Sequence, residues 1–373
     1  MSSRQFTPFG GSGEIVTLDN INEYDDLPPL AEIDSPDVYE IRTGDLGTDY
    51  LVPMQDGSTD FNDWYSLVDG QVLRAIPDNL AYGSADDNVY IHDTGDWSLS
   101  QTLSEALDDV ESVTFSPDGN FVAYTSIDNN VYVHNTSDWG LEQTLTESEE
   151  GIVSVTFSPD SNLIAYSEGF PEDNVYIHNT SDWGLEQTLN EGSNQTSDVE
   201  FSPDGNLIAY VSYNGNLYIR NTDSWDLVET ISETDERLES VAFSPDGNLI
   251  THSDDDGDVY IHNTSNWSLE QTLVQAENVV LSVTFSPDNN LIAYADRFGE
   301  SVFIHNTSDW GVEETLIQAE GVLNTVTFSP DGSLISYGSQ DDNVYVHDTS
   351  DWSLIETLTE AEAAVESVTF SPL

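Results

Sequence analysis

Histidine is the residue type in this chain whose repetition most strongly suggests metal binding or acid–base chemistry. Six of the seven histidines occupy the same place in a repeated segment: His92, His134, His178, His262, His305 and His347. A zinc site needs several ligands within roughly 2.0–2.1 Å of one ion, whereas each of these histidines belongs to a different copy of the repeat. The pattern therefore predicts separate packing positions between repeats. His252 is predicted to fill a slot that Tyr210 and Tyr294 fill in other copies, which leaves no histidine for general-base catalysis.

Carboxylates are too numerous to single out a catalytic pair, because the chain holds 71 acidic residues. Two acidic runs, 254–258 and 56–60, resemble cation loops, but neither matches the twelve-residue calcium loop. Solvated acidic turns are the preferred interpretation of both runs. A nucleophile elbow, a phosphate-binding loop and a dinucleotide fingerprint are also missing from the sequence. We therefore predict no enzyme activity, no metal site and no cofactor.

The six Asn-x-Ser/Thr sequons also have a structural interpretation. Four of them belong to a repeated His-Asn-Thr-Ser turn, and other copies of this turn carry Asp93 or Asp348 in place of asparagine. Such an interchange of Asn and Asp is typical of a turn closed by the side-chain oxygen. Glycosylation remains an alternative, and Asn194 is the sequon that lies in a variable segment.

The charge of the chain is extreme, with 71 acidic residues, six basic residues and a net charge of −65. Self-repulsion of this size opposes a compact state in dilute salt. Disorder is not expected, because 37% of the residues are hydrophobic and they recur at a fixed period. The composition is typical of a protein from a haloarchaeon or from a virus of such a host. Direct binding of nucleic acid is not expected, since phosphate contacts need clustered Lys and Arg.

Membrane insertion and secretion also lack support in the sequence. No apolar run approaches the roughly 18 residues that a membrane span needs. Residues 1–13 show neither the basic region nor the apolar region of a secretory signal. We therefore expect no membrane insertion, and an extracellular role would require release by another route.

A repeat of about 42 residues determines the elements that position these side chains. Phe-Ser-Pro-Asp begins at Phe115, Phe157, Phe201, Phe243, Phe285 and Phe328, and a truncated copy begins at Phe370. Each copy contains four strand-like runs, which in one unit are 199–201, 206–210, 217–220 and 225–231. Trp225 is predicted to lie on the fourth, outer strand. A period near 42 with four strands is typical of one blade of a β-propeller. We therefore predict an all-β, seven-bladed propeller over residues 76–373.

The two ends of this ring are predicted to meet in one blade. Residues 365–370 form a first strand with nothing after it, whereas the unit at 79–103 has only strands two to four. We predict that the C-terminal strand completes the first blade, which removes the open edges of the ring. Residues 36–75 are predicted to form a small β-meander, too short to bury much surface alone. Residues 1–35 are predicted to form an extended arm.

Residues 76–373 resemble the WD-repeat β-propellers. The resemblance lies in the Phe-Ser-Pro-Asp-Gly turn, the apolar strand after it, and the Val-Tyr-Ile-His-Asn strand in the place of the family's Val-Arg-Leu-Trp-Asp. The family's Trp is His here, or Arg220 in one copy, and the family's Gly-His dipeptide is absent. The hydrogen-bond network that the family uses inside each blade is therefore not carried over. The resemblance implies a seven-bladed ring with a scaffold or binding role.

One face of the predicted ring is uniform and the other is variable. The Ser-Pro-Asp-Gly and Asn-Thr-Ser-Asp turns recur almost unchanged, and alternate turns of a four-stranded meander lie on the same face. The connections on the opposite face vary and contain aromatic and Arg residues, which protein interfaces favour: Phe170, Tyr213, Arg237, Arg297 and Phe298. We predict that these five residues form a binding patch. Ordinary variation between loops is the alternative.

Two non-enzymatic functions fit these features. In the first, the chain is a structural or attachment protein on the virion surface of a haloarchaeal virus, and its propeller binds a host cell-surface glycoprotein or another virion protein. The arm then holds it in a homo-oligomer or a larger assembly. The arm residues expected to make these contacts are Phe6, Phe9, Ile15, Val16, Leu18, Leu27 and Leu30. In the second, the chain is a scaffold protein of the haloarchaeal cytoplasm.

We expect the folded state to require salt. The Debye length is about 10 Å at 0.1 M ionic strength and about 3 Å at 1 M, so only concentrated salt screens a net charge of −65. Circular dichroism should show β-structure in multimolar KCl and its loss on dilution to about 0.1 M. A spectrum that does not change on dilution would contradict the halophilic interpretation.

Overall fold

The computed structural model describes residues 79–170, 173–190 and 195–372, together with the backbone of five strands nearer the N-terminus. Every helix-or-strand element among these residues is a β-strand. None of the described segments is a helix long and apolar enough to cross a membrane. The chain divides into a unit of residues 1–75 and a unit of residues 76–372.

The N-terminal unit contains one five-stranded sheet. Its strands, in spatial order, are β1 (Ile15–Leu18), β2 (Val38–Arg42), β3 (Thr48–Pro53), β4 (Trp64–Val68) and β5 (Gln71–Leu73). β2 to β5 form an antiparallel meander, and β1 pairs with β2 in parallel. Within the predicted arm, residues 15–18, with Ile15, Val16 and Leu18, form β1 and pair with β2. The other predicted arm contacts, Phe6, Phe9, Leu27 and Leu30, lie outside the described residues.

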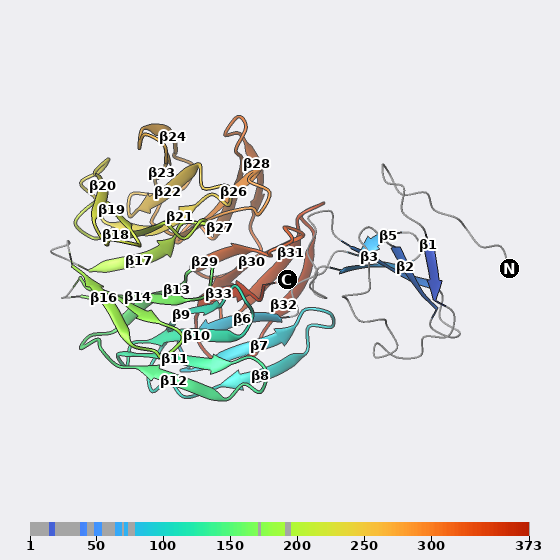
Figure 1. The fold of residues 1–373 in the computed structure, drawn as a ribbon. Helices are drawn as coiled ribbons and strands as arrows, with labels where there is room; N and C mark the ends of the chain where they lie inside the picture. The colour runs from blue at the N-terminus through green and yellow to red at the C-terminus, as the bar shows by residue number, and fades with distance from the viewer. Residues whose placement is uncertain are drawn as a thin grey trace. The chain divides into compact units, whose positions relative to one another are not determined.

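The described residues between 79 and 372 form seven four-stranded antiparallel sheets, which confirms the predicted propeller (Figure 1). Blade 1 contains, from the inner strand outward, β33 (Val365–Phe370), β6 (Asn79–Ser84), β7 (Val89–Asp93) and β8 (Leu99–Leu103). Blade 2 contains β9 (Val110–Phe115), β10 (Phe121–Ser126), β11 (Asn130–Asn135) and β12 (Leu141–Leu145). Blade 3 contains β13 (Ile152–Phe157), β14 (Leu163–Glu168), β15 (Val175–Asn179) and β16 (Leu185–Leu189).

The remaining blades repeat this order. Blade 4 contains β17 (Thr196–Phe201), β18 (Leu207–Ser212), β19 (Asn216–Asn221) and β20 (Leu227–Ile231). Blade 5 contains β21 (Leu238–Phe243), β22 (Leu249–Asp254), β23 (Val259–Asn263) and β24 (Leu269–Leu273). Blade 6 contains β25 (Val280–Phe285), β26 (Leu291–Asp296), β27 (Ser301–Asn306) and β28 (Val312–Leu316). Blade 7 contains β29 (Leu323–Phe328), β30 (Leu334–Ser339), β31 (Val344–Asp348) and β32 (Leu354–Leu358).

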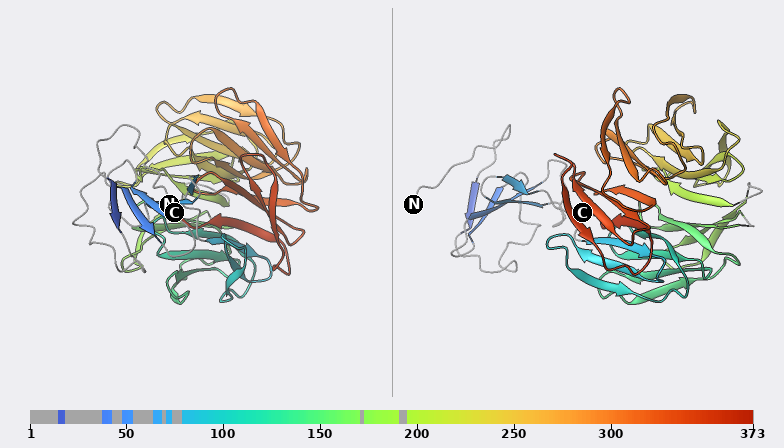
Figure 2. Two further views of the ribbon diagram at one scale, coloured as in Figure 1. Left: turned by 90° about the vertical axis from the view of Figure 1, so that its right-hand side faces the viewer. Right: turned by 180° about the vertical axis from the view of Figure 1, so that it is seen from behind.

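The C-terminal strand closes the ring, as predicted. β33 pairs antiparallel with β6, with Phe370 opposite Leu80 and Val368 opposite Tyr82. The inner strand of each blade also packs against the inner strands of its two neighbours, and β33 lies between β29 and β9. Two further views show the same ring of sheets (Figure 2). No blade of the ring therefore has an unpaired inner strand.

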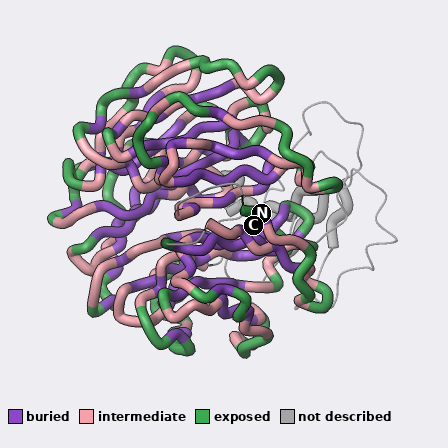
Figure 3. The backbone as a smooth tube through the Cα atoms, turned by 90° about the vertical axis from the view of Figure 1, so that its left-hand side faces the viewer, coloured by how far each residue is buried: buried purple, intermediate pink, exposed green. Residues whose placement is uncertain are grey.

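The hydrophobic core lies between the blades. Each of seven buried clusters combines residues of two adjacent blades; one of them brings Val131 and Leu145 of blade 2 together with Phe157 and Tyr166 of blade 3. Strand residues are buried toward the interior, while the turns at the edges are exposed (Figure 3). A blade therefore buries its apolar surface only when both neighbours are present.

The repeated tryptophans lie in turns, which corrects the prediction that Trp225 lies on the outer strand. β20 begins at Leu227, and Trp225 has a φ of 60°. The seven tryptophans that recur in the propeller repeat have a φ between 57° and 61°: Trp97, Trp139, Trp183, Trp225, Trp267, Trp310 and Trp352. This conformation costs a non-glycine residue roughly 1–3 kcal/mol. The Trp225 N–H donates to the carbonyl of Asn221 at 2.8 Å, and the ring packs against the cluster that joins blades 3 and 4. This packing offsets the backbone cost.

Removal of residues 365–373 should sharply lower the melting temperature, because β6 loses its inner partner strand and the cluster between blades 7 and 1 loses three apolar side chains. A finer test compares F370A with F328A, since Phe370 and Phe328 are equally buried at equivalent positions. If the closing blade is packed as well as the other blades, both variants should lose about 3–5 kcal/mol of unfolding free energy. An unchanged unfolding free energy in F370A, together with a large loss in F328A, would contradict closure by β33.

Candidate functional site

The uniform face of the ring is built from self-satisfied turns. In all six Ser-Pro-Asp turns the serine hydroxyl donates to the aspartate carboxylate at 2.6–2.7 Å. In one of them, hydrogen bonds from Ser158 and Asn162 hold the pKa of Asp160 below its usual value. These carboxylates serve the fold of the turn, so the face they form offers little that distinguishes one blade from another.

The second repeated turn uses asparagine and aspartate in the same way, as predicted. The side-chain oxygen of Asn135 accepts from the backbone N–H and the hydroxyl of Ser137, at 2.9 and 2.6 Å. Asp348 accepts the same two bonds from Ser350, at 2.7 and 2.5 Å. The asparagines of these sequons are therefore turn acceptors.

The repeated histidines are buried and bond within single blades, so the prediction that they pack between repeats is wrong. The Nδ1 atom of His178 lies 3.0 Å from the carbonyl oxygen of Trp183. Because a carbonyl oxygen can only accept, Nδ1 carries the proton. The hydroxyl of Tyr166 lies 3.2 Å from the Nε2 atom and 3.1 Å from Glu147, so these two acceptors share its one proton. This network contains residues of one blade and a glutamate of the connection that leads into it.

The same network recurs around the ring. Its third member is a glutamate in three blades and a glutamine in two: Glu360, Glu105, Glu147, Gln275 and Gln318. Blade 5 replaces Tyr with His252, whose Nε2 lies 3.3 Å from that of His262. Burial lowers the pKa of His252 to about 3, so its ring is neutral. This network was not predicted from the sequence, although tyrosine and histidine recur together in most repeats.

The acidic turns on the variable face are also partly structural. Asp128 accepts from the hydroxyl of Tyr132 at 2.7 Å and from the N–H of Leu107 at 2.8 Å. In the run 254–258, Asp254 is buried and accepts from the N–H groups of Asp256 and Asp258. This run is a structural turn, and the run 56–60 lies outside the described residues.

The most exposed apolar side chains all lie on the variable face. Five apolar residues have between 57% and 81% of their surface exposed, and every one lies in a connection of this face: Leu107, Phe170, Val274, Phe298 and Ile317. Other exposed apolar residues among the described residues do not exceed 50%. Phe170 and Phe298 were predicted from the sequence, whereas the three aliphatic residues were not, because residue type alone does not show that a side chain is exposed.

The predicted binding patch divides into pairs. The guanidinium carbon of Arg237 lies 5.1 Å from the ring centroid of Tyr213, and that of Arg297 lies 5.4 Å from the ring of Phe298. Both are cation–π distances. Phe170 belongs to neither pair and lies on blade 3.

The charge of Arg297 affects the pKa of three glutamates on inner strands. Glu111, Glu239 and Glu366 occupy the second position of β9, β21 and β33, next to the variable face. Burial raises the pKa of Glu111 and Glu239 to about 7, and the positive charge of Arg297 acts in the opposite direction. Arg297 has the same opposing effect on Glu366, whose pKa burial also raises. The glutamates went unnoticed among the 71 acidic residues.

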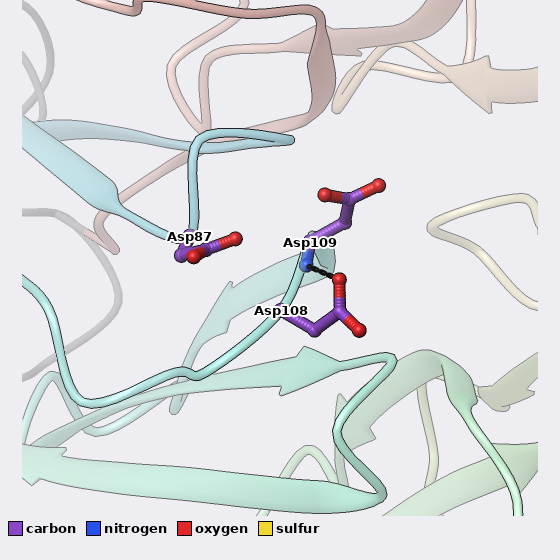
Figure 4. Close-up of side chains that lie close together, drawn as sticks. All are labelled: Asp87, Asp108 and Asp109. Atoms are coloured by element: carbon purple, nitrogen blue, oxygen red, sulfur yellow. Dashed lines mark hydrogen bonds between the residues drawn. The ribbon is translucent and has the colours of Figure 1, made fainter.

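A group of three carboxylates lies between blades 1 and 2. Asp87 comes from the β6–β7 turn, and Asp108 and Asp109 come from the connection before β9 (Figure 4). Their carboxylate oxygens lie within 4.8 Å of one another. Burial and the two neighbouring charges raise the pKa of Asp109. Exposed groups of this kind are common in acidic chains, so this trio alone does not define a metal site.

Comparison with known families agrees with this architecture. Residues 180–373, more than half of the chain, match the family described as the TolB beta propeller domain. The chain belongs to this family. Residues 97–135 of this TolB-type propeller also match the WD domain, G-beta repeat. No curated protein matches the chain. The fold and both families are consistent with a protein-interaction role, and WD-type propeller scaffolds are typically non-enzymatic.

The glutamates next to the variable face predict a pH dependence of stability. Their folded pKa of about 7 lies above the ordinary value of 4.5, so the folded form binds protons more tightly than the unfolded form. Stability from these groups is complete below pH 4.5 and is lost as the pH rises through about 7. Denaturant unfolding at constant ionic strength should show this loss.

The variant E111Q/E239Q should flatten this pH dependence. The matched control is E142Q, because Glu142 is exposed on the outer strand of blade 2 and should leave the pH dependence unchanged. Equal pH dependence in wild type and E111Q/E239Q would show that burial of these glutamates does not control the titration.

Proposed function

We propose that this propeller is a non-enzymatic interaction protein that binds a protein partner through its variable face. The observation that carries the proposal is that the five most exposed apolar side chains of the described residues all lie in connections of that one face, on several blades. Large exposed apolar surface on a soluble protein marks interaction sites.

The composition of this face supports the proposal. Arg237 and Arg297 stack on aromatic rings there, and aromatic and Arg residues are frequent hot spots of protein interfaces. The opposite face carries turns whose polar groups bond to each other. A partner therefore gains apolar contacts on the variable face that the uniform face does not offer.

In its narrower form, the proposal assigns the chain to the virion surface of a haloarchaeal virus, where it binds a host cell-surface glycoprotein or another virion protein. The net charge of −65 supports a high-salt setting, and the separate N-terminal sheet supports attachment to a larger assembly. The alternative is a cytoplasmic haloarchaeal scaffold. Detection of the chain in purified particles, or only in the cytoplasmic fraction of cells, distinguishes the two settings.

The binding face can be tested by replacing Leu107, Phe170, Val274, Phe298 and Ile317 together with serine. These side chains are exposed, so the ring should stay folded while binding weakens at least tenfold, which corresponds to a loss of about 1.4 kcal/mol. Binding can be measured by co-sedimentation with envelopes and by crosslinking in extracts from halophilic cells.

A matched control replaces Leu141, Leu185 and Leu269 with serine. These residues are also exposed, but they lie at equivalent positions on outer strands. Loss of binding in the first variant alone supports the variable face. Equal loss in both variants, or full binding by the first, would show that the partner contacts another surface.

A further inference from the structure

The channel on the axis of the propeller contains a cavity of about 420 Å³. The inner strands β17, β21, β25, β29 and β33 contribute to its wall. Serine and threonine hydroxyls make up much of its polar lining, including Ser240, Ser282, Thr284 and Thr325. A water molecule in the liquid occupies about 30 Å³, so the cavity has room for an ion with a complete hydration shell.

One blade differs from all others in what it contributes to the channel. At the third position of the inner strand, six blades carry Ser or Thr and blade 4 carries Asp198. At the fifth position, the other blades carry Thr or, in blade 5, Ala242, while blade 4 carries Glu200. Both carboxylates line the cavity, and no basic residue is among its lining residues. Blade 4 thus places two acidic groups in a wall of hydroxyls.

Asp198 is held firmly by its surroundings. One carboxylate oxygen accepts from the hydroxyl of Ser154 at 2.7 Å and from the N–H of Val199 at 2.9 Å. The other accepts from the hydroxyl of Ser240 at 3.1 Å and from the N–H of Val241 at 3.0 Å. Four donors leave little room for direct contact with a ligand, so Asp198 supplies charge and orients the hydroxyls.

Glu200 and Thr325 retain free ligand atoms. The Oε2 atom of Glu200 accepts from the N–H of Phe243 at 2.7 Å, and its Oε1 atom has no hydrogen-bond partner among the described residues. Thr325 is only 8% exposed and lines the same cavity, and its hydroxyl also makes no bond within the described part of the chain. Burial raises the pKa of Glu200 to about 8 and also raises that of Asp198. A nearby positive charge would favour their ionised forms.

We propose that the channel binds a hydrated Mg²⁺ ion through the Oε1 atom of Glu200. Mg²⁺ keeps several of its waters and is usually held by one or two carboxylates, which agrees with one free carboxylate oxygen in a roomy cavity. Asp198 supplies a second negative charge, and Thr325 accepts a hydrogen bond from the water shell. No metal site was predicted from the sequence, because residue type does not distinguish these two carboxylates from the other acidic residues.

The test replaces Asp198 and Glu200 with the residues that other blades use, in the variant D198S/E200T. At constant ionic strength, Mg²⁺ should raise the melting temperature of the wild-type protein and should have no such effect on the variant. The matched control, E142T/E186T, removes two exposed carboxylates from outer strands and should respond to Mg²⁺ like the wild type. An equal Mg²⁺ response in D198S/E200T would overturn the proposal.

The position of the ion can be read directly from crystals soaked with Mn²⁺, which gives an anomalous signal. A peak beside Glu200 in the wild type that is lost in D198S/E200T supports the site. Peaks only at Asp87, Asp108 and Asp109, or only elsewhere on the surface, would overturn it. If D198S/E200T does not fold, E200Q keeps Asp198 and removes the charge of the ligand, and an unchanged peak in E200Q would also overturn the proposal.

Discussion

The pairing of β33 with β6 is the constraint on which the rest of this propeller depends. Each hydrophobic cluster joins two adjacent blades, so no blade has a complete core of its own. Closure supplies the seventh cluster, which joins blade 7 to blade 1, and it gives β6 a partner along the register from Val365 to Phe370. Residues from the two ends of the ring therefore share one sheet, and the stability of every blade is coupled to that pairing.

A hydrogen-bond network of buried polar side chains stabilises the interior of the blades. A histidine fixes the carbonyl of the tryptophan turn, and a tyrosine links that histidine to a Glu or Gln of the preceding connection. The network satisfies buried polar atoms that would otherwise destabilise the fold. It also explains why part of the acidic composition is structural: residues such as Glu147 and Asp128 bond to tyrosine hydroxyls or backbone N–H groups.

Function in such a ring arises where the repeats differ. The exposed apolar residues break the repeat pattern on the variable face, and blade 4 alone contributes acidic residues to the cavity in the channel. The charge of Arg297 lowers the pKa of glutamates on three other blades. The repeated turns of the opposite face preserve the geometry. A nearly symmetric scaffold thus carries an asymmetric surface and an asymmetric channel, and these support the proposals for a protein partner and for a cation.

The sequence by itself determined the number of blades, the four strands of each and the closure by residues 365–370, because the same local pattern is repeated seven times. It also determined that one face of the ring carries uniform turns and the other carries variable connections, since the residues that form a turn are close together in the sequence. Tertiary structure decided which side chains are exposed, as at Leu107. It also placed Trp225 in the turn before the outer strand. It also decided which carboxylates face the channel. A β-bulge between Thr196 and Asp198 shifts the register of β17, and one residue of register exchanges the two faces of a strand. The direction of Asp198 and Glu200 therefore depends on pairing within the sheet, which residue types alone do not reveal.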